Sequence, residues 1–260
     1  MPSPPAPLPI VIARTGGTFP ALRTRLGDFE DWVRAGLGGT AAPVLTIDAA
    51  RGDGMPEPAS IAGVVVTGSH AMVTDQAPWS EALGGWIARA VALQTPVLGI
   101  CYGHQLLAHA LGGEVADHPG GWEIGTVDVG TVPDATGSDA LFAGLPAAFD
   151  AQVVHRQSVR RLPAGAVRLA GNAFEPHQAF RVGHCAWGVQ FHPEFGPDAM
   201  RGYIDTLAAD LRHAGRDPGT LRGHVRATPE AAALLGRFGR FCLRNHGPAP
   251  APSGPPPAVG

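Results

Sequence analysis

The sequence predicts an α/β protein with an open, doubly wound, mostly parallel sheet, to which antiparallel strands and C-terminal helices are added. Two observations lead to this prediction. Short apolar runs alternate with segments of helical periodicity as far as Gly113, which gives a β-α-β order. One run, residues 61–67 (IAGVVVT), is apolar throughout, as expected for a parallel strand with both faces buried. In a sheet of this kind, ligands bind beyond the carboxyl ends of the strands.

The apolar runs before Gly113 are expected to form the parallel part of the sheet. These runs lie at residues 8–13, 43–47, 61–67 and 96–100. Helices are expected at residues 28–37 and 78–93, where apolar side chains recur at helical spacing. A third helix is expected after Cys101, because the helical pattern there stops at Gly112.

The second half of the chain is richer in strands. Five short segments separated by turns predict antiparallel strands, at residues 122–132, 155–159, 166–170, 178–182 and 186–192. Helices are expected from Asp198 to a stop at Gly215 and over residues 229–244, the second one capped by Thr228. We therefore expect one domain over residues 8–246, with its core at about 10–197 and its C-terminal helices at 198–246. Residues 1–7 and 247–260 offer little to bury and are predicted to be disordered tails.

Composition and charge are those of an ordinary soluble protein. A formal charge of −3 and 45% hydrophobic residues favour neither a nucleic-acid nor a membrane partner. The basic residues are all arginine, which together with the abundant Ala, Gly and Pro indicates a GC-rich bacterial coding sequence. We read no signal peptide at the N-terminus and find no apolar run long enough to span a membrane. The scattered histidines, without Cys-x-x-Cys or His-Glu-x-x-His spacing, favour neither a metal site nor a cofactor.

The three cysteines do not fit a disulfide framework. Cys101, Cys185 and Cys242 are odd in number and widely spaced, which favours a reducing compartment, and the cytoplasm is the expected location. Cys101 differs from the other two because it lies in a Gly-x-Cys-x-Gly motif between the last parallel strand and a helix. Such a tight turn is expected to aim the sulfur at solvent and to place it at a helix N-terminus, where the dipole favours thiolate. The alternative is a small buried hydrophobe, the common state of a free cysteine.

A second motif supplies a base for such a nucleophile. The apolar residues 186–191 end at His192, which is expected to lie where a strand reaches the surface. Glu194 follows two residues later, so an extended backbone through Pro193 would return the carboxylate to the imidazole's side. The carboxylate would then orient the imidazole, as in other nucleophile–base pairs. The alternative is an exposed strand end with a glutamate near the next helix.

The two motifs together resemble those of the class I glutamine amidotransferases. Residues 99–105 (GICYGHQ) match the family's Gly-x-Cys-x-Gly-x-Gln, and residues 190–194 (QFHPE) match its later His-Pro-Glu. The resemblance covers roughly residues 10–197 and implies a flavodoxin-like fold. Residues 121–125 (GWEIG) and the C-terminal helices are most similar to freestanding proteins related to the amidotransferase domain of GMP synthetase. Two departures are a missing Gly-Gly-Pro in the oxyanion loop and His155-Arg156-Gln157 in place of His-Gly-Asp.

The resemblance implies a thioester mechanism without a cofactor or metal. The Cys101 thiolate would attack the γ-carbonyl of glutamine or another γ-glutamyl compound, and His192, oriented by Glu194, would protonate the leaving amine. Water would then hydrolyse the γ-glutamyl thioester. The resemblance also assigns oxyanion-binding N–H groups to Tyr102 and to Gly68 or Ser69, and substrate contacts to Gln105 and His155.

Several functions remain open from the sequence. A γ-glutamyl peptidase would use the same residues on γ-glutamyl peptides or conjugates. A third possibility is a non-catalytic or partner-dependent synthetase component, although all three members of the expected triad are present. Redox or deglycation enzymes with a similar cysteine turn lack His-Pro-Glu, which disfavours that class. No synthetase domain follows Glu194 in this sequence, so any acceptor of ammonia is expected on a separate synthetase subunit.

Overall fold

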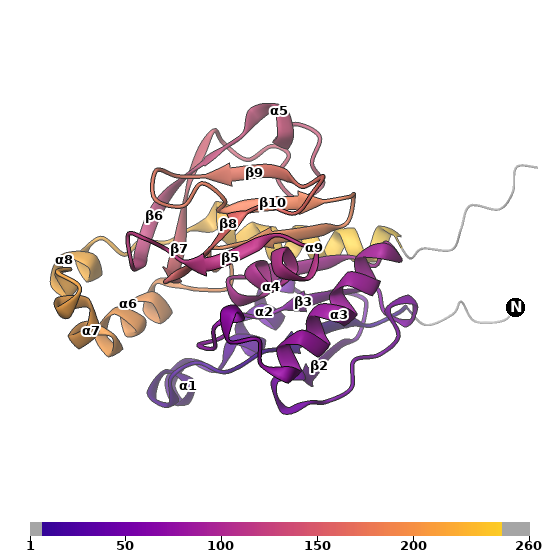
Figure 1. Ribbon diagram of the computed structural model, residues 1–260, viewed down its shortest axis with the longest axis horizontal. Helices are drawn as coiled ribbons and strands as arrows, with labels where there is room; N and C mark the ends of the chain where they lie inside the picture. The colour runs from indigo at the N-terminus through magenta and orange to yellow at the C-terminus, as the bar shows by residue number, and fades with distance from the viewer. Residues whose placement is uncertain (1–6, 246–260) are drawn as a thin grey trace, which may run out of the picture.

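A nine-stranded mixed sheet runs through the protein (Figure 1). The computed structural model describes residues 7–245, so the predicted tails lie, apart from Pro7, outside the described residues. Neighbouring strands follow the order β2-β1-β3-β4-β11-β10-β9-β6-β7. Their bounds are β1 (Ile10–Arg14), β2 (Val44–Asp48), β3 (Gly63–Val66), β4 (Val97–Ile100), β6 (Glu123–Thr131), β7 (Ala148–His155), β9 (Val167–Gly171), β10 (Ala179–Val182) and β11 (Ala186–Val189). The predicted α/β fold with a doubly wound, mostly parallel first half is confirmed.

Helices cover both faces of the parallel strands, because alternate strand residues are apolar on both sides. Ile10 and Ile12 of β1 pack in one core with α2 (Phe29–Leu37) and α9 (Pro229–Asn245). Val11 and Ala13 face the other core, which contains α3 (Pro78–Ala92) and α4 (Tyr102–Ala110). These two layers fix the carboxyl ends of β3 and β4 side by side.

The predicted antiparallel part needed three corrections. Strand β11 was expected to be antiparallel and to reach His192, but it ends at Val189 and pairs parallel with β4 as well as antiparallel with β10. The strand predicted at 155–159 is instead the end of β7 and the separate strand β8 (Gln157–Arg161), broken at Arg156. Strand β8 pairs with the unpredicted β5 (Glu114–Asp117) in a second, two-stranded sheet. Backbone pairing across long sequence distances decides these breaks, and the local pattern does not contain it.

A third cluster of helices lies beside the carboxyl ends of the parallel strands. The helix expected from Asp198 to Gly215 is two helices, α6 (Pro197–Thr206) and α7 (Ala208–His213), which meet at Leu207. Two short helices were not predicted, α1 (Pro20–Leu26) and α8 (Pro218–Gly223), since each buries only one residue. The remaining helical segments are α5 (Pro133–Thr136) and the 3-10 turns η1 (Ala49–Arg51), η2 (Pro58–Ser60) and η3 (Val73–Asp75). No helix within residues 7–245 is long and apolar enough to cross a membrane.

Candidate active site

Cys101 occupies a strained turn between β4 and α4. Its backbone has φ 49° and ψ −95°, a conformation that costs a residue with a β-carbon free energy. The turn closes tightly, because a β-carbon on Gly99 would lie 2.3 Å from the carbonyl oxygen of Gly103. One on Gly103 would lie 2.4 Å from the carbonyl oxygen of Val66 in β3. The glycines of the motif are therefore required by packing, as the sequence predicted.

The Cys101 sulfur does not point into open solvent. Cys101 is only 7% exposed and lines a cavity of about 270 Å³, with its sulfur 3.8 Å from the carbonyl oxygen of Val154 in β7. The expectation of a solvent-facing thiol is corrected, because β7 and residues from the α1, α6 and α7 region cover the turn. Cys101 is the N-cap of α4, so the Tyr102 N–H at the first helical position has no acceptor within the helix.

His192 and Glu194 form a buried pair beside this turn. The distance between His192 Nδ1 and Glu194 Oε1 is 2.7 Å, and the two side chains are 3% and 0% exposed. The expected extended backbone is wrong, because residues 192–195 form a turn in which the Phe195 N–H bonds to the His192 carbonyl at 3.3 Å. The His192 N–H also donates to the Gln152 carbonyl of β7 at 2.8 Å, which fixes the backbone of the turn.

Two neighbours, Glu194 and Cys101, stabilise the charged form of His192. Burial alone would lower the pKa of His192, but its interactions with Glu194 and Cys101 raise it to about 10. Nε2 of His192 has no hydrogen-bond partner among residues 7–245. The ring is held further by Phe195, stacked at 4.1 Å between ring centroids. The arrangement favours a protonated His192 whose Nε2 has no partner within the described part of the chain.

The loop after β3 approaches the same point. A β-carbon on Gly68 would lie 3.0 Å from His192 Cε1 and 3.9 Å from the β-carbon of Cys101, so this glycine borders both groups. Ser69, the next residue, lines the cavity. The structure thus brings together the ends of β3 and β4 and the turn after β11, as the motifs suggested. These are three neighbouring strands of the sheet.

Comparison with known proteins agrees with this arrangement. The family model "Glutamine amidotransferase class-I" matches residues 53–206, more than half of the chain. This chain belongs to the class I glutamine amidotransferases. The match includes the Cys101 turn, the loop after β3 and the His-Pro-Glu turn.

Among curated relatives, glutamine-hydrolyzing GMP synthases are similar to this amidotransferase. The Thermomicrobium roseum enzyme is 41% identical over 132 residues, which are 51% of this chain and 23% of the relative. The Aeropyrum pernix enzyme is 34% identical over 176 residues, 64% of this chain and 31% of the relative. One glutamine-hydrolyzing GMP synthase subunit from Archaeoglobus fulgidus is 38% identical over 120 residues, 44% of this chain and 62% of that protein. This amidotransferase therefore spans only about a quarter to a third of the Thermomicrobium and Aeropyrum relatives.

Solved structures show the same fold. A glutamine amidotransferase from Thermotoga maritima superposes with a TM-score of 0.69 at 23% identity, over 90% of this chain and 97% of that one. A glutamine amidotransferase from Methylobacillus flagellatus gives a TM-score of 0.66 at 27% identity, over 92% of this chain and 93% of that one.

The two residues predicted to contact the substrate, Gln105 and His155, lie at the cavity wall. Most of their polar side-chain atoms are already hydrogen-bonded to other protein groups. Gln105 donates its Nε2 to the Gln157 carbonyl at 2.8 Å and to Gln190 Oε1 at 3.0 Å. His155 has Nδ1 3.0 Å from the Gln157 carbonyl and Nε2 2.8 Å from Glu123. Both side chains are buried and line the cavity. The ring nitrogens of His155 thus hold the wall together, and a direct substrate contact through them would require breaking these bonds.

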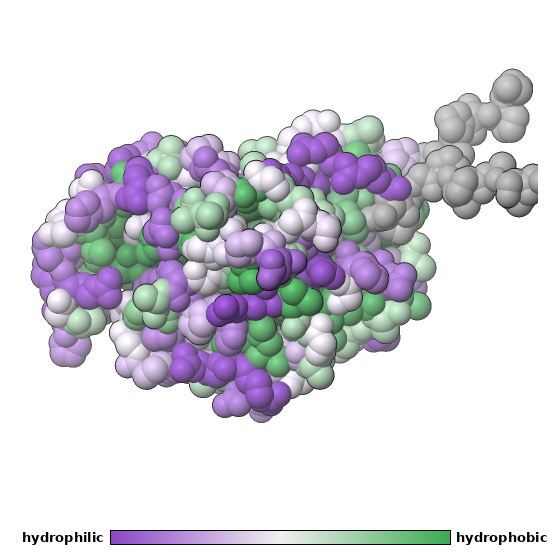
Figure 2. Space-filling model, turned by 90° about the horizontal axis from the view of Figure 1, so that it is seen from above, coloured by the Kyte–Doolittle hydropathy of each residue, from purple (hydrophilic) through white to green (hydrophobic). Residues whose placement is uncertain are grey.

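The outer wall of the cavity contains residues that the sequence did not single out. Phe19 before α1, Trp122 before β6, and Tyr203 and Leu207 of α6 and its C-terminal end make this wall largely apolar. Figure 2 shows apolar surface framed by hydrophilic side chains at the end of the molecule where α6, α7 and α8 lie. Trp122 lies in the segment GWEIG, but only the contacts of the folded chain bring the four side chains together.

His70 lines the cavity together with His155 and His192. Its Nε2 lies 3.0 Å from the Tyr203 hydroxyl, and its ring packs at a tilt against Phe19, with 4.5 Å between the ring centroids. Burial lowers the pKa of His70, and the charge of His192 lowers it further. Its position two residues after Gly68 was the available sequence signal. Within residues 7–245, no group of three or more His, Cys, Asp or Glu side chains could hold a metal ion.

Proposed function

We propose that this protein hydrolyses the γ-amide of glutamine to glutamate and ammonia, with Cys101 as nucleophile, His192 as acid and base, and Glu194 as its partner. The observation that carries this proposal is the position of His192, whose pKa is raised by both Glu194 and Cys101 at the wall of one cavity. A neutral thiol and a neutral imidazole would be poorer catalysts, since the thiolate is the nucleophile.

In the proposed reaction, the proton on His192 Nε2 is given to the leaving nitrogen. The Cys101 thiolate adds to the γ-carbonyl carbon and gives a tetrahedral oxyanion. Collapse breaks the C–N bond while His192 gives its Nε2 proton to the leaving nitrogen, which departs as ammonia. Water then attacks the thioester, His192 takes the proton from that water, and glutamate leaves as the thiolate is regenerated. Glu194 stabilises the imidazolium without itself moving a proton.

The oxyanion needs hydrogen-bond donors that are free before the substrate arrives. The Tyr102 N–H at the start of α4 is one candidate, because the helix leaves it without an internal acceptor. The N–H groups of Gly68 and Ser69 are the other candidates, because the loop at Gly68 borders Cys101. Such donors act in a water-poor site, where removing one costs about 10²- to 10³-fold in kcat.

Ammonia released here would be used by another polypeptide. One support is the similarity to the Archaeoglobus fulgidus protein, which is named as one subunit of a GMP synthase. Another is that the similarity to the longer GMP synthases covers only about a quarter to a third of their length. We therefore propose that the partner is a separate synthetase subunit. A cytoplasmic location is proposed because Cys101, Cys185 and Cys242 are free thiols.

A second candidate function is hydrolysis of γ-glutamyl peptides or conjugates at the same triad. The apolar outer wall formed by Phe19, Trp122, Tyr203 and Leu207 favours this alternative, because free glutamine has an NH₂ leaving group and needs no apolar contact there. The chemistry would be unchanged and only the leaving amine would differ.

The proposal is tested by turnover and by labelling of the purified protein. Wild-type protein should release glutamate from glutamine, and Cys101→Ser should release none. Iodoacetamide should alkylate the native protein once, at Cys101, since burial raises the pKa of both Cys185 and Cys242. Cys185→Ser serves as the control and should retain both turnover and labelling. Wild-type turnover by Cys101→Ser would overturn the proposal.

A further inference from the structure

Thr15 follows β1 at the point where backbone pairing between β1 and β3 ends. The last paired residues of the two strands are Ala13 and Val66. Beyond them Thr15 is 1% exposed and Thr67 is fully buried, and their side chains continue the pairing. The Thr15 N–H donates to Thr67 Oγ1 at 3.1 Å, in the place where a strand would offer a carbonyl.

Both threonine hydroxyls bind carbonyls of the loop at Gly68. Thr15 Oγ1 lies 2.9 Å from the Thr67 carbonyl oxygen and 2.9 Å from that of Gly68. Thr67 Oγ1 lies 3.1 Å from the Gly68 carbonyl oxygen. Each hydroxyl has one proton, so the set is satisfied when Thr15 donates to the Thr67 carbonyl and Thr67 donates to that of Gly68. The two carbonyls are thus turned toward β1.

A planar trans peptide points its C=O and its N–H in opposite directions. Holding the Thr67 carbonyl therefore turns the Gly68 N–H away from β1, and holding the Gly68 carbonyl does the same for the Ser69 N–H. Neither N–H donates a hydrogen bond to any acceptor within residues 7–245. Gly68 itself borders His192 and Cys101, at 3.0 Å and 3.9 Å from a β-carbon built on it. Two free donors therefore belong to the loop that borders the Cys101 side chain.

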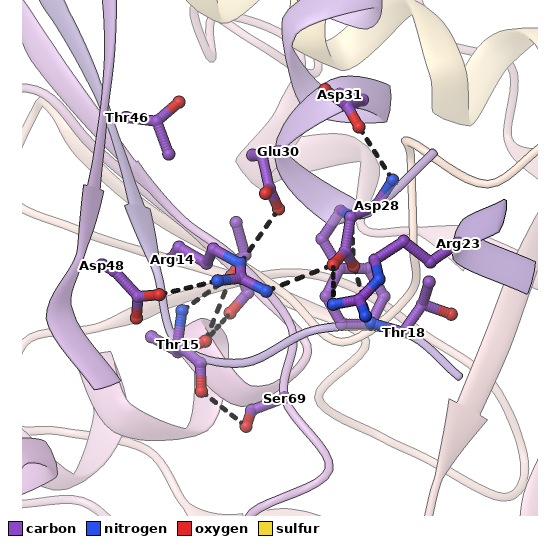
Figure 3. A network of polar contacts seen from close by, with 12 residues as sticks. Arg14, Thr15, Thr18, Arg23, Asp28, Glu30, Asp31, Thr46, Asp48 and Ser69 are labelled. Carbon is purple, nitrogen blue, oxygen red and sulfur yellow. Dashed lines mark hydrogen bonds and ion pairs between the residues drawn. The ribbon is translucent and has the colours of Figure 1, made fainter. Parts of the chain in front are cut away.

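Polar contacts hold the backbone on both sides of Thr15 (Figure 3). Arg14 bonds Asp48 of β2 at 2.6 Å and Asp28 at 3.2 Å, and Glu30 lies 3.2 Å from its Nε. Burial opposes the charge of Arg14, yet the three carboxylates raise its pKa. Ser69 Oγ donates to the Thr15 carbonyl at 2.7 Å, which fixes the far end of the loop. Arg14 thus holds the backbone from which Thr15 reaches the loop.

We infer that Thr15 is a positioning residue for the oxyanion site: its hydroxyl holds the loop carbonyls so that the Gly68 and Ser69 N–H groups face the oxyanion formed at Cys101. This inference rests on the proposed function. Thr15 does not touch the substrate. It acts through the orientation of two peptide groups, and it should matter only when negative charge develops on the substrate oxygen.

The test compares a reaction that forms an oxyanion with one that does not. Thr15→Val removes the hydroxyl and keeps the branched shape, and its kcat for glutamine should fall by at least about tenfold with KM little changed. Alkylation of Cys101 by iodoacetamide should keep its wild-type rate, because displacement at the methylene carbon forms no oxyanion. Thr15→Ser restores the hydroxyl and should restore kcat. Thr46→Val is the control, since this hydroxyl on β2 bonds Arg34 away from the loop.

Each outcome decides between the two proposals. Wild-type kcat in Thr15→Val, or parallel losses of kcat and alkylation, would overturn the role of Thr15 while the proposed function stands. Failure of Thr15→Ser to restore kcat would also overturn it. Thr15→Ala gives the same comparison if the valine variant does not fold. Turnover that survives Cys101→Ser, or a wild-type protein inert on both glutamine and γ-glutamyl anilide, would instead reject the proposed function.

Discussion

The imidazole of His192 and the carboxylate of Glu194 are separated by one residue and bonded at 2.7 Å, because the backbone between them turns. This turn brings the carboxylate to the imidazole, and the bond from the His192 N–H to the Gln152 carbonyl of β7 fixes the turn itself. The pair is buried as a unit, with Glu194 behind His192 and only the histidine at the cavity wall. The unequal positions of the two residues predict unequal effects when each is removed.

His192→Ala should abolish most turnover and Glu194→Ala should be milder. In the proposed mechanism the histidine moves the proton, and general acid–base help is worth about 10²- to 10⁴-fold in rate, whereas the glutamate only orients the ring and stabilises its charge. Steady-state kcat on glutamine measures both variants. His109→Ala is a matched control, since His109 pairs with Glu81 at 3.1 Å on the surface. A Glu194→Ala enzyme slower than His192→Ala would contradict this division of roles.

The pH profile should report the charge on His192. Its pKa is raised from 6.5 to about 10, so the protonated acid is kept as pH rises through neutrality and is lost only near that value. The contribution of this charge to folding stability changes with pH in the same direction. It is fully present below pH 6.5 and disappears as the pH rises through about 10. We expect the alkaline limb of kcat/KM to move to lower pH in Glu194→Gln, which keeps the shape and removes the charge. An unmoved limb would show that Glu194 does not control this proton.

The turn around Cys101 offers a packing test with its own control. Gly103→Ala would place a β-carbon 2.4 Å from the Val66 carbonyl oxygen, so the backbone of β3 or α4 must shift. We expect the free energy of unfolding to fall by about 1–3 kcal/mol, and turnover to fall with it because the shift reaches Cys101. Gly85→Ala in α3 meets no atom within 4 Å and should instead stabilise the helix by about 0.5–1 kcal/mol. Denaturant unfolding of the two variants provides the comparison.

The parallel half of the fold and the two motifs were predictable from local pattern. Apolar runs followed by Gly68 and by Cys101 marked β3 and β4, and the Cys101 glycines could be identified because packing allows no other residue there. The turn at Pro193 could not be predicted, since proline fixes only its own φ and leaves the direction of the chain to tertiary contacts. Thr15 and Thr67 were also invisible in the sequence, as 52 residues separate two unremarkable threonines. The cavity wall was missed for the same reason.

The outer wall allows the two candidate substrates to be separated. Trp122 lines the cavity, and Arg156 lies 5.9 Å over its ring, so the indole is held in place at the mouth. If the wall receives the leaving amine, Trp122→Ala should lower kcat/KM for γ-glutamyl anilide about tenfold relative to glutamine, because one lost apolar contact is worth about 1–3 kcal/mol. Leu45→Ala, on an exposed side chain of β2, is the control. An equal effect on both substrates would assign the wall a purely structural role.

A wild-type kcat/KM far higher for γ-glutamyl peptides than for glutamine would favour the peptidase. Weak turnover of both that rises when a synthetase subunit is added would favour the partner-dependent amidotransferase, since docking would then complete the mouth of the cavity.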